Sequence, residues 1–308
     1  MSRKWTADEI PDQDGRLAII TGANSGLGYF TALELARSGA QVVMACRSAQ
    51  KGDTAAAEIR EDIGGTALSV SELDLGSLDS VRRFADEFAG KRVGLLVNNA
   101  GVMMTPRRTT ADGFELQLGT NHLGHFALTG LLLETLGRSD SARIVTLSSN
   151  EHKGGRIDFD DLQQERDYSP RGSYQRSKLA NAVFAIELDR RLRAAQSRVI
   201  SVFAHPGYSD TNLQSTGPTG VAKAMLAISN RVLAQSADRG ALPTLYAATA
   251  PGVKGGEYYG PDGRGEFRGF PKRVEAIPAA HDPEIGSRLW QVSEELTGVR
   301  YPLGGAVA

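Results

Sequence analysis

The stretch that decides the fold is LAIITGANSGLGYFTALELA, residues 17–36. An apolar run typical of a β-strand ends in a loop with glycines at positions 22, 26 and 28, and a helix-like pattern follows. Glycine has no Cβ, so such a loop can approach a phosphate group, and the helix that follows offers free N–H groups at its N-terminus. Glycine-rich turns are common, so this stretch alone leaves open a plain tight turn and a nucleotide-binding loop.

Apolar runs of strand length recur along the chain and alternate with helix-like stretches. They lie at residues 17–20, 41–45, 67–73, 94–97, 143–147 and 199–204, with a weaker run at 257–259. Several are apolar almost without alternation, which is typical of parallel strands covered on both faces. The lengths between them suit right-handed crossovers. The sequence therefore predicts an α/β fold with a doubly wound, seven-stranded parallel sheet flanked by helices.

The 308 residues are enough for two average domains, but α/β folds of this length often form one. No proline-rich linker divides the chain, so we expect a single domain over residues 1–308. Thr6 and Glu9 have the spacing of a capping box for a short N-terminal helix. Asp282, Pro283 and Gly298 predict the start and the end of a last helix.

Composition and charge exclude several classes of protein. Lys and Arg number 35 against 36 Asp and Glu, and no basic run indicates binding to nucleic acid. Cys46 is the only cysteine, which rules out an intrachain disulfide and fits a reducing compartment. No signal peptide and no run of about 18 uncharged apolar residues is present. We therefore expect a cytoplasmic protein without a membrane anchor.

The glycine loop departs from the common G-x-G-x-x-G pattern, because Thr31 stands where the third glycine would be. Read as Thr21-Gly22-x-x-x-Gly26-x-Gly28, it resembles the signature of the classical short-chain dehydrogenase/reductase family. Further motifs of that family follow in order over about residues 15–265: LDL at 73–75, NNAG at 98–101, TNHLGHF with Asn121, RIVTLSS ending at Ser149, YQRSK with Tyr174 and Lys178, and HPGYSDT at 205–211.

The residues of several motifs are similar to those found in one branch of the family. TGANSGLG, VVMACRS, NHLGHF and SKLAN resemble retinol dehydrogenases, WW-domain oxidoreductase and light-dependent protochlorophyllide reductase. The light-driven activity is disfavoured, because that group places a cysteine near its pigment and Cys46 is the only one in this sequence. Membrane-bound retinoid enzymes carry an N-terminal apolar anchor, which we do not find, so the natural substrate stays open.

The resemblance implies a Rossmann-type domain with strand order 3-2-1-4-5-6-7. It also implies hydride transfer between a nicotinamide and the carbonyl or alcohol carbon of a small or medium hydrophobic substrate. In that family Tyr174 would exchange a proton with the substrate oxygen and Ser149 would bind that oxygen; Ser148 competes, but the second serine usually has the role. Lys178 would also hold the nicotinamide ribose, and Asn121 would position a water in a proton relay.

Tyr174 and Lys178 are one helical turn apart, so their side chains share a face. A phenol has a pKa of about 10, which is too high for efficient acid–base chemistry at neutral pH. A nearby ammonium favours the phenolate, so we expect Lys178 to lower the pKa of Tyr174.

The resemblance also implies which residues contact the nucleotide. Asp74 and Leu75 would lie near the adenine, and the segment from Pro206 to Thr211 would face the carboxamide. The full set is Gly22, Asn24, Ser25, Gly26, Leu27, Gly28, Arg47, Asp74, Leu75, Asn98, Asn99, Ala100, Gly101, Tyr174, Lys178, Pro206, Gly207 and Thr211.

The end of the second predicted strand indicates which nicotinamide cofactor binds. An acid there would accept the ribose 2′-hydroxyl of NAD, whereas an arginine accommodates the 2′-phosphate of NADP. Cys46 stands where an NAD enzyme carries Asp, and Arg47 can pair bidentately with phosphate. Ser25 is neutral, so a basic contact of some members is missing, and Arg47 could be merely solvated. NADP(H) is favoured and NAD(H) stays open.

One segment is longer than in the simplest members of the family, and another is the expected substrate loop. Residues 150–173 form an insertion that we expect over the active site or over the face through which members often dimerise. That face is formed by the helices with Asn121 and Tyr174, and a homodimer is our weakest prediction. Residues 208–238 are the expected substrate loop.

The sequence fits a metal site and two other functions less well. His122 and His125 have helical spacing, but no third ligand is visible, so we predict no metal site and expect His125 to be packed or solvated. A nucleotide-binding sensor without turnover remains the alternative function, although the intact set of Ser149, Tyr174, Lys178 and Asn121 argues against it. An extended-type epimerase would carry Gly-x-x-Gly-x-x-Gly, which the loop does not match.

Overall fold

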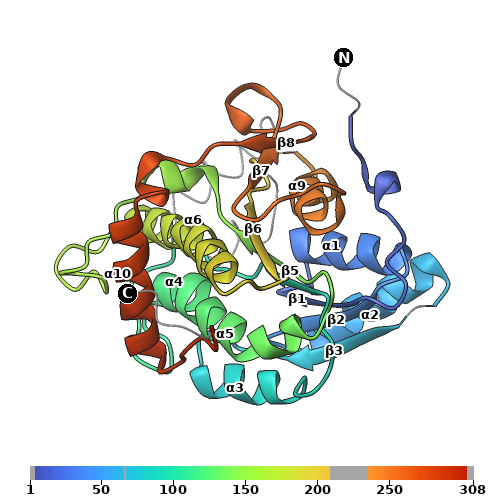
Figure 1. Cartoon of the computed structure of the whole chain (residues 1–308), viewed down its shortest axis with the longest axis horizontal. Helices are drawn as coiled ribbons and strands as arrows, with labels where there is room; N and C mark the ends of the chain where they lie inside the picture. The colour runs from blue at the N-terminus through green and yellow to red at the C-terminus, as the bar shows by residue number, and fades with distance from the viewer. Residues whose placement is uncertain (1–3, 66, 209–234, 304–308) are drawn as a thin grey trace.

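The protein is organised around one twisted sheet, which Figure 1 shows at the centre of the molecule. The computed structural model describes residues 4–65, 67–208 and 235–303. Within them the strand order is β3-β2-β1-β4-β5-β6-β7-β8. The strands are β1 (Leu17–Thr21), β2 (Gln41–Cys46), β3 (Leu68–Glu72), β4 (Leu95–Asn98), β5 (Arg143–Leu147), β6 (Ile200–Ala204), β7 (Tyr258–Pro261) and β8 (Pro271–Val274).

The first seven strands are parallel and follow the predicted order, which is confirmed. The prediction of a purely parallel sheet of seven strands is wrong in one respect, because β8 adds an antiparallel edge next to β7. The four residues of β8 include exposed Lys272 and Arg273, so no apolar run marks them. Charges and a proline are tolerated on an edge strand, and they also discourage pairing with another chain.

Helices cover both faces of the sheet. One face carries α1 (Gly26–Arg37), α2 (Ala49–Ile63) and α9 (Ala237–Thr249), and the other carries α3 (Leu78–Asp86), α5 (Gly124–Gly137) and α6 (Pro170–Ala194). Each layer buries its own apolar cluster against the strands. The other long helix of the described residues is α10 (Pro283–Thr297). The short helical elements are η1 (Ala7–Glu9), α4 (Leu116–Leu118), η2 (Gly119–Leu123), η3 (Asn150–Gly154), η4 (Arg264–Glu266) and η5 (Pro278–Ala280). None of the helices in the described ranges is both long and apolar enough to cross a bilayer.

Both predicted terminal helices are present. The capping box of Thr6 and Glu9 forms, although it begins only the single turn η1. Asp282 accepts hydrogen bonds from the first N–H groups of α10, Pro283 is its first residue, and Gly298 ends it with a left-handed φ of 67°. Local capping chemistry therefore fixes where α10 begins and ends.

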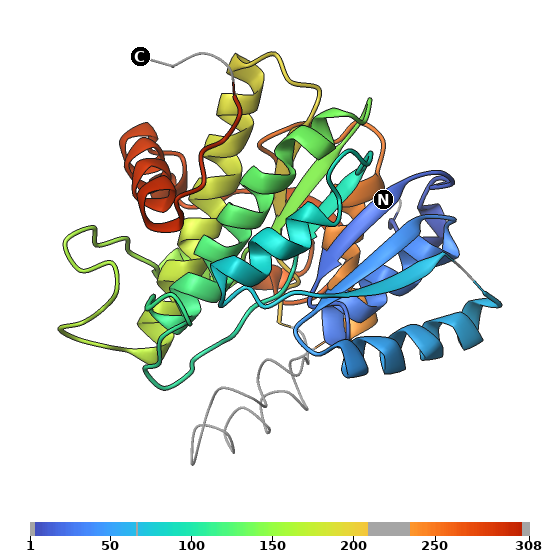
Figure 2. The same cartoon turned by 90° about the horizontal axis from the view of Figure 1, so that it is seen from below.

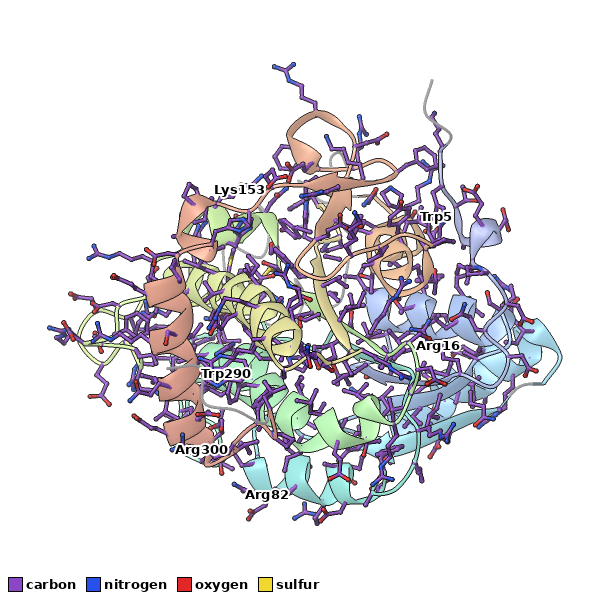
Figure 3. All side chains as sticks on the ribbon, in the orientation of Figure 1. Trp5, Arg16, Arg82, Lys153, Trp290 and Arg300 are labelled. Atoms are coloured by element: carbon purple, nitrogen blue, oxygen red, sulfur yellow. The ribbon has the colours of Figure 1, made fainter. Side chains whose placement is uncertain are left out.

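Helix α10 packs on the outside of α5 and α6, as Figures 1 and 2 both show. Trp290, labelled in Figure 3, is 4% exposed, and its ring centre lies 5.2 Å from that of Phe126 on α5 and 6.2 Å from that of Phe184 on α6. The helix thus covers part of the face that we expected to form a homodimer.

The insertion at residues 150–173 borders both regions over which we expected it, the active site and the face of the expected homodimer. It begins with η3, directly after Ser149. Further along, Leu162 packs with Leu118 and Leu123, and Asp160 lies 3.6 Å from Arg288 of α10. The insertion therefore extends from the end of β5 to the outer helices, so it covers neither region alone.

The parallel strands end at one edge of the sheet, and the chain reverses its direction of winding between β1 and β4. At such a switch point the loops after neighbouring strands diverge and leave a crevice. The loops that follow β1, β4, β5 and β6 carry most of the predicted functional residues, so the topology alone brings them together.

Candidate active site

A cavity of about 740 Å³ opens at this edge of the sheet. Its size is typical of a site for a cofactor or another small molecule. The predicted residues that line it come from the glycine loop, the NNAG segment, the end of β5, α6 and the segment after β6: Gly22, Asn24, Ser25, Gly26, Leu27, Gly28, Asn99, Ala100, Gly101, Ser149, Tyr174, Lys178, Pro206 and Gly207.

The glycine loop needs its glycines for two different reasons. Gly22 has a left-handed φ of 66°, which favours glycine. A Cβ on Gly28 would lie 2.4 Å from the carbonyl oxygen of Gly22 and 2.6 Å from Nδ2 of Asn99, so only glycine fits. Helix α1 then begins without a side-chain cap from Ser25. The cradle and the uncapped N–H groups fit a pyrophosphate, for which a helix N-terminus is well suited.

A buried network ties this loop to β4. Thr21 Oγ1 accepts hydrogen bonds of 2.9 Å from the backbone N–H groups of both Asn99 and Ala100. His125 joins it through Nδ1, 2.9 Å from the carbonyl oxygen of Asn121, and Nε2, 2.9 Å from Thr21 Oγ1. Since a carbonyl can only accept, the proton is on Nδ1 and Nε2 accepts from the threonine hydroxyl. Burial lowers the pKa of His125 to about 3, so it stays neutral.

His125 is therefore packed, as expected, and does not act as a metal ligand in this network. No group of three or more potential metal-ligating side chains occurs in the part of the chain that the structure describes.

Helix α6 presents Tyr174 and Lys178 to the cavity, where they are 5% and 4% exposed. The Lys178 ammonium lies 5.7 Å from the centre of the Tyr174 ring and donates to the carbonyl oxygen of Leu147 at 3.1 Å. The side chains of Ser149 and Tyr174 hydrogen-bond to each other. The hydroxyl of Ser148 instead donates to the carbonyl oxygen of Lys178 at 2.8 Å, which supports Ser149 as the serine that meets a substrate.

The electrostatics of the pair differ from the sequence-based expectation. The pKa of Tyr174 is raised to about 12, mainly by burial, while the hydrogen bond with Ser149 lowers it and the nearby Glu151 raises it to a smaller extent. Burial also lowers the pKa of Lys178 to about 8. The predicted lowering of the tyrosine pKa is wrong here, because desolvation of the buried phenolate is the largest cause of the shift and Lys178 is not among its causes. At neutral pH the phenol keeps its proton and the lysine keeps its charge.

Asn121 is fully buried in the π-helical turn η2 and does not line the cavity. Its side chain accepts from the N–H of Val102 at 2.8 Å, and donates to the carbonyl oxygen of Val102 and to Ser177 Oγ at 2.9 Å each. A Cβ on Gly101 would lie 3.0 Å from Asn121 Oδ1 and 3.8 Å from Lys178 Nζ. Asn121 thus holds the segment after β4 close to Lys178, and such π-turns are frequent at functional sites.

Several predicted residues lie away from the cavity lining. Asp74 accepts from the N–H of Gly76 at 2.8 Å, Leu75 is buried in the core, and Asn98 is buried with its amide donating to Thr129 at 3.0 Å. Arg47 is exposed just after β2 and does not line the cavity. Thr211 and most of the expected substrate loop, residues 209–234, lie outside the described residues.

The cavity also contains residues that the sequence did not reveal. Lys51, Thr54 and Glu58 come from α2, and Lys51 follows Arg47 by one helical turn, a spacing that could have drawn attention to it. At the other end, Asn150 and Glu151 belong to the insertion at residues 150–173 and Tyr208 begins the expected substrate loop. No sequence signal marked Met103, Met104 and Phe267.

Comparison with known proteins agrees with this geometry. The family model for short chain dehydrogenases matches residues 16–220. Retinol dehydrogenase 13 of Homo sapiens is 42% identical over 294 residues, which cover 94% of this chain and 86% of the relative. The crystal structure of an uncharacterized protein from Mycobacterium paratuberculosis has 44% identity and a TM-score of 0.82, and the match covers 97% of this chain and 100% of that chain.

A second similar structure contains a nucleotide. It is a protein from Beutenbergia cavernae described as an NAD(P)-dependent gluconate 5-dehydrogenase, with NADP bound at low occupancy. It has 25% identity and a TM-score of 0.63, and the match covers 80% of this chain and 95% of that chain. The motifs, the fold and the matches agree: the chain belongs to the classical short-chain dehydrogenase/reductase family of oxidoreductases, in the branch that resembles retinol dehydrogenases.

Proposed function

We propose that the protein transfers a hydride between NADP(H) and the carbonyl or alcohol carbon of a small or medium hydrophobic substrate, with Tyr174 as acid and base. The observation that carries the proposal is the convergence of Ser149, Tyr174 and Lys178 with the glycine loop on one cavity. When bound, the nicotinamide supplies or accepts the hydride.

In the direction of reduction, the Tyr174 hydroxyl donates its proton to the substrate oxygen. Burial keeps that hydroxyl protonated, as the raised pKa of Tyr174 indicates. The Ser149 hydroxyl donates a hydrogen bond to the same oxygen, and the charged Lys178 stabilises the phenolate that Tyr174 becomes. In oxidation the same groups act in reverse, with the phenolate as the base.

The preference for NADP(H) rests on the residues around the end of β2. Cys46 cannot accept a hydrogen bond from a ribose hydroxyl as a carboxylate would, and exposed Arg47 lies beside it. Lys51 lines the cavity one helical turn further on and offers a second positive charge. Glu58 also lines the cavity, and its carboxylate would favour NAD(H). The use of NAD(H) therefore stays open. The similar protein from Beutenbergia cavernae has NADP bound.

The preference for a hydrophobic substrate rests on the other end of the cavity, where Met103, Met104 and Phe267 line it. An apolar lining with few polar groups is typical of sites for apolar small molecules. The name of the relative retinol dehydrogenase 13 points to retinol, which is an apolar alcohol.

The proposal is tested by measuring turnover of the full chain with NADPH, NADP⁺ and their NAD counterparts. The panel spans short and long aldehydes, ketones and alcohols, with retinal and retinol among the long ones. We expect turnover with NADP(H), followed by the absorbance of the reduced nicotinamide. Binding of NADPH without turnover of any substrate would favour the alternative, a nucleotide-binding sensor. No binding of either nucleotide would refute both functions.

A location in the cytoplasm stays a proposal. So does a homodimer, and the packing of α10 on α5 and α6 argues against these two helices as its interface. Sedimentation separates the two states, because a monomer has a mass of 32.9 kDa.

A further inference from the structure

The loop between β7 and β8 brings an aromatic side chain to the cavity. Phe267 lines it and is 53% exposed; the other large apolar side chain of comparable exposure in the described ranges is Leu131 of α5, at 37%. We propose that Phe267 determines substrate specificity by packing on the apolar chain of the substrate, and that Glu266 positions it. The inference rests on the proposed function and identifies the residues that would select for long apolar substrates.

An exposed phenyl ring in the lining of the cavity needs a physical reason. A large apolar side chain in water lacks the favourable free energy that burial would contribute. Phe267 shares the cavity lining with Met103, Met104 and the catalytic Tyr174. An apolar ligand in that cavity would cover the ring, and exposed apolar surface within a cavity is a common mark of a ligand site.

Glu266, the residue directly before Phe267, has a strained backbone conformation. Its φ is 58°, which is uncommon for any residue with a Cβ. Its carboxylate lies 3.0 Å from the ammonium of Lys153, labelled in Figure 3, and 3.2 Å from Nε2 of His205. Since the N–H of Gly207 donates to Nδ1 of His205 at 3.2 Å, the proton of a neutral imidazole is on Nε2, which faces the Glu266 carboxylate but has no hydrogen-bond partner of good geometry. These two partners lower the pKa of Glu266 to about 2.

A second set of contacts ties the same loop to the catalytic serine. Asn150 follows Ser149, and its side-chain amide donates to the carbonyl oxygens of Gly265 and Glu266 at 3.2 Å each. Lys153 belongs to the same short turn, η3. The backbone just before Phe267 is thus bound to the segment that carries Ser149, although about a hundred residues separate them along the chain.

A third contact joins the loop to the segment that we expected to face the nicotinamide. The N–H of Tyr208 donates to the carbonyl oxygen of Phe267 at 2.7 Å. A Cβ on Gly207, whose φ is +68°, would lie 2.4 Å from that oxygen, so the approach requires glycine. The backbone of Phe267 is therefore held in place while its ring stays available to a ligand.

The two methionines are held in a comparable way. Met104 has a left-handed φ of 50°, and its N–H donates to Oε1 of Gln117 at 2.7 Å. The buried amide of Gln117 donates in turn to the hydroxyl of Tyr168 and the carbonyl oxygen of Pro170, at 3.0 Å each. Strained residues held by buried side chains often belong to functional sites. Both strained segments contribute an apolar side chain to the lining of the same cavity.

The test measures KM and kcat for the unbranched aldehydes from butanal to dodecanal with saturating NADPH. Phe267→Ala should raise the KM for dodecanal about tenfold, as expected when a hydrophobic pocket loses a contact. The KM for butanal, the kcat values and the affinity for NADPH should stay close to those of the wild type. Leu131→Ala, which removes the other exposed apolar side chain, is the matched control and should change none of these.

The positioning role of Glu266 is tested by the same chain-length profile. Glu266→Ala should raise the KM for dodecanal and spare butanal, and adding it to Phe267→Ala should cause no further increase. Glu266→Gln keeps an oxygen that can accept from the ammonium of Lys153, so it should recover most of the wild-type profile. Equal losses for short and long aldehydes would mean that Glu266 acts only on stability, and the positioning role would be wrong.

The outcomes separate the inference from the proposed function. If the wild type reduces aldehydes and Phe267→Ala leaves the KM for dodecanal unchanged, the inference is wrong and the proposed function stands. If the wild type turns over no aldehyde, ketone or alcohol of the panel, the proposed function fails, and calorimetric titration of dodecanol into the NADP⁺ complex decides the inference. Binding about tenfold weaker in Phe267→Ala would then support it, and equal binding would refute it.

Discussion

The two ends of the cavity are built in different ways. At the nucleotide end, Gly22, Ser25 and Gly28 lie in one continuous strand–turn–helix segment, and their contacts are set by local backbone geometry. At the substrate end, Met104 and Phe267 come from loops far apart in the sequence and are held by side-chain hydrogen bonds and an ion pair. A short motif can specify the conformation of a local segment. In an assembly of distant loops, the residues that line the cavity can be replaced without disturbing the nucleotide end.

Tyr174 lies where the two ends meet, and its replacement should have the largest effect. Tyr174→Phe removes the proton donor but keeps the ring, so turnover should fall about 10²–10⁴-fold. The affinity for NADPH, measured by fluorescence titration, should be retained because the glycine loop is unchanged. The control is Tyr246→Phe on α9, whose ring packs on Trp5 outside the cavity. Near-normal turnover in Tyr174→Phe would show that another group moves the proton.

Gly28→Ala should damage the nucleotide end specifically. The added methyl group would overlap the carbonyl oxygen of Gly22 and the amide of Asn99, and overpacking of this kind costs about 1–3 kcal/mol. We expect the affinity for NADPH to fall at least about tenfold. Gly137→Ala is the matched control, since a Cβ there meets no atom within 4 Å, and it should leave the affinity unchanged. Similar effects of the two substitutions would contradict the cradle.

The positive charges beside β2 should control the choice of nucleotide. A charge-assisted contact with the 2′-phosphate contributes about 1.5–3 kcal/mol, which corresponds to at least about a tenfold preference for NADPH over NADH. Arg47→Asp should reverse the preference. Lys51→Ala should weaken it, because Lys51 lines the cavity. Titration of both nucleotides measures the ratio, and a ratio that stays the same in both variants would remove these residues from the recognition of the phosphate.

The pH profile should show the smallest effect. Burial lowers the pKa of Lys178 to about 8, so its ammonium loses the proton as the pH rises through that value. The phenolate that Tyr174 becomes during reduction then loses its nearby cation, and kcat/KM for reduction should decline above about pH 8. Arginine stays protonated in this range, so an active Lys178→Arg variant should not show this decline. A wild-type profile that stays level to about pH 10 would contradict the lowered pKa.

The sequence predicted most of the fold because the parallel strands are continuous apolar runs. Arg143–Leu147, for example, coincides with β5. The charged residues of β8 carry no such signal, so the antiparallel edge strand could not be foreseen. Whether β8 pairs with β7 depends on which strands lie next to it in the folded protein. The sequence of β8 alone does not specify this partner.

The candidate site divides in the same way. Ser149, Tyr174 and Lys178 belong to short motifs and were predicted, and the structure brings them together. The direction of the tyrosine pKa was not predictable, because it depends on burial by residues from distant segments. Phe267 was missed for a related reason: its position depends on contacts such as that between Lys153 and Glu266, 113 residues apart.

The most direct test of the account follows the hydride itself. The full chain is incubated with NADPH that carries deuterium at the transferable position of the nicotinamide, together with an aldehyde that it reduces, and the alcohol is analysed by mass spectrometry. We predict deuterium on the former carbonyl carbon in the wild type and in Tyr246→Phe, and a rate lower by about 10²–10⁴-fold in Tyr174→Phe. Bound NADPH without deuterium in any alcohol would contradict hydride transfer and favour a protein that only senses the nucleotide.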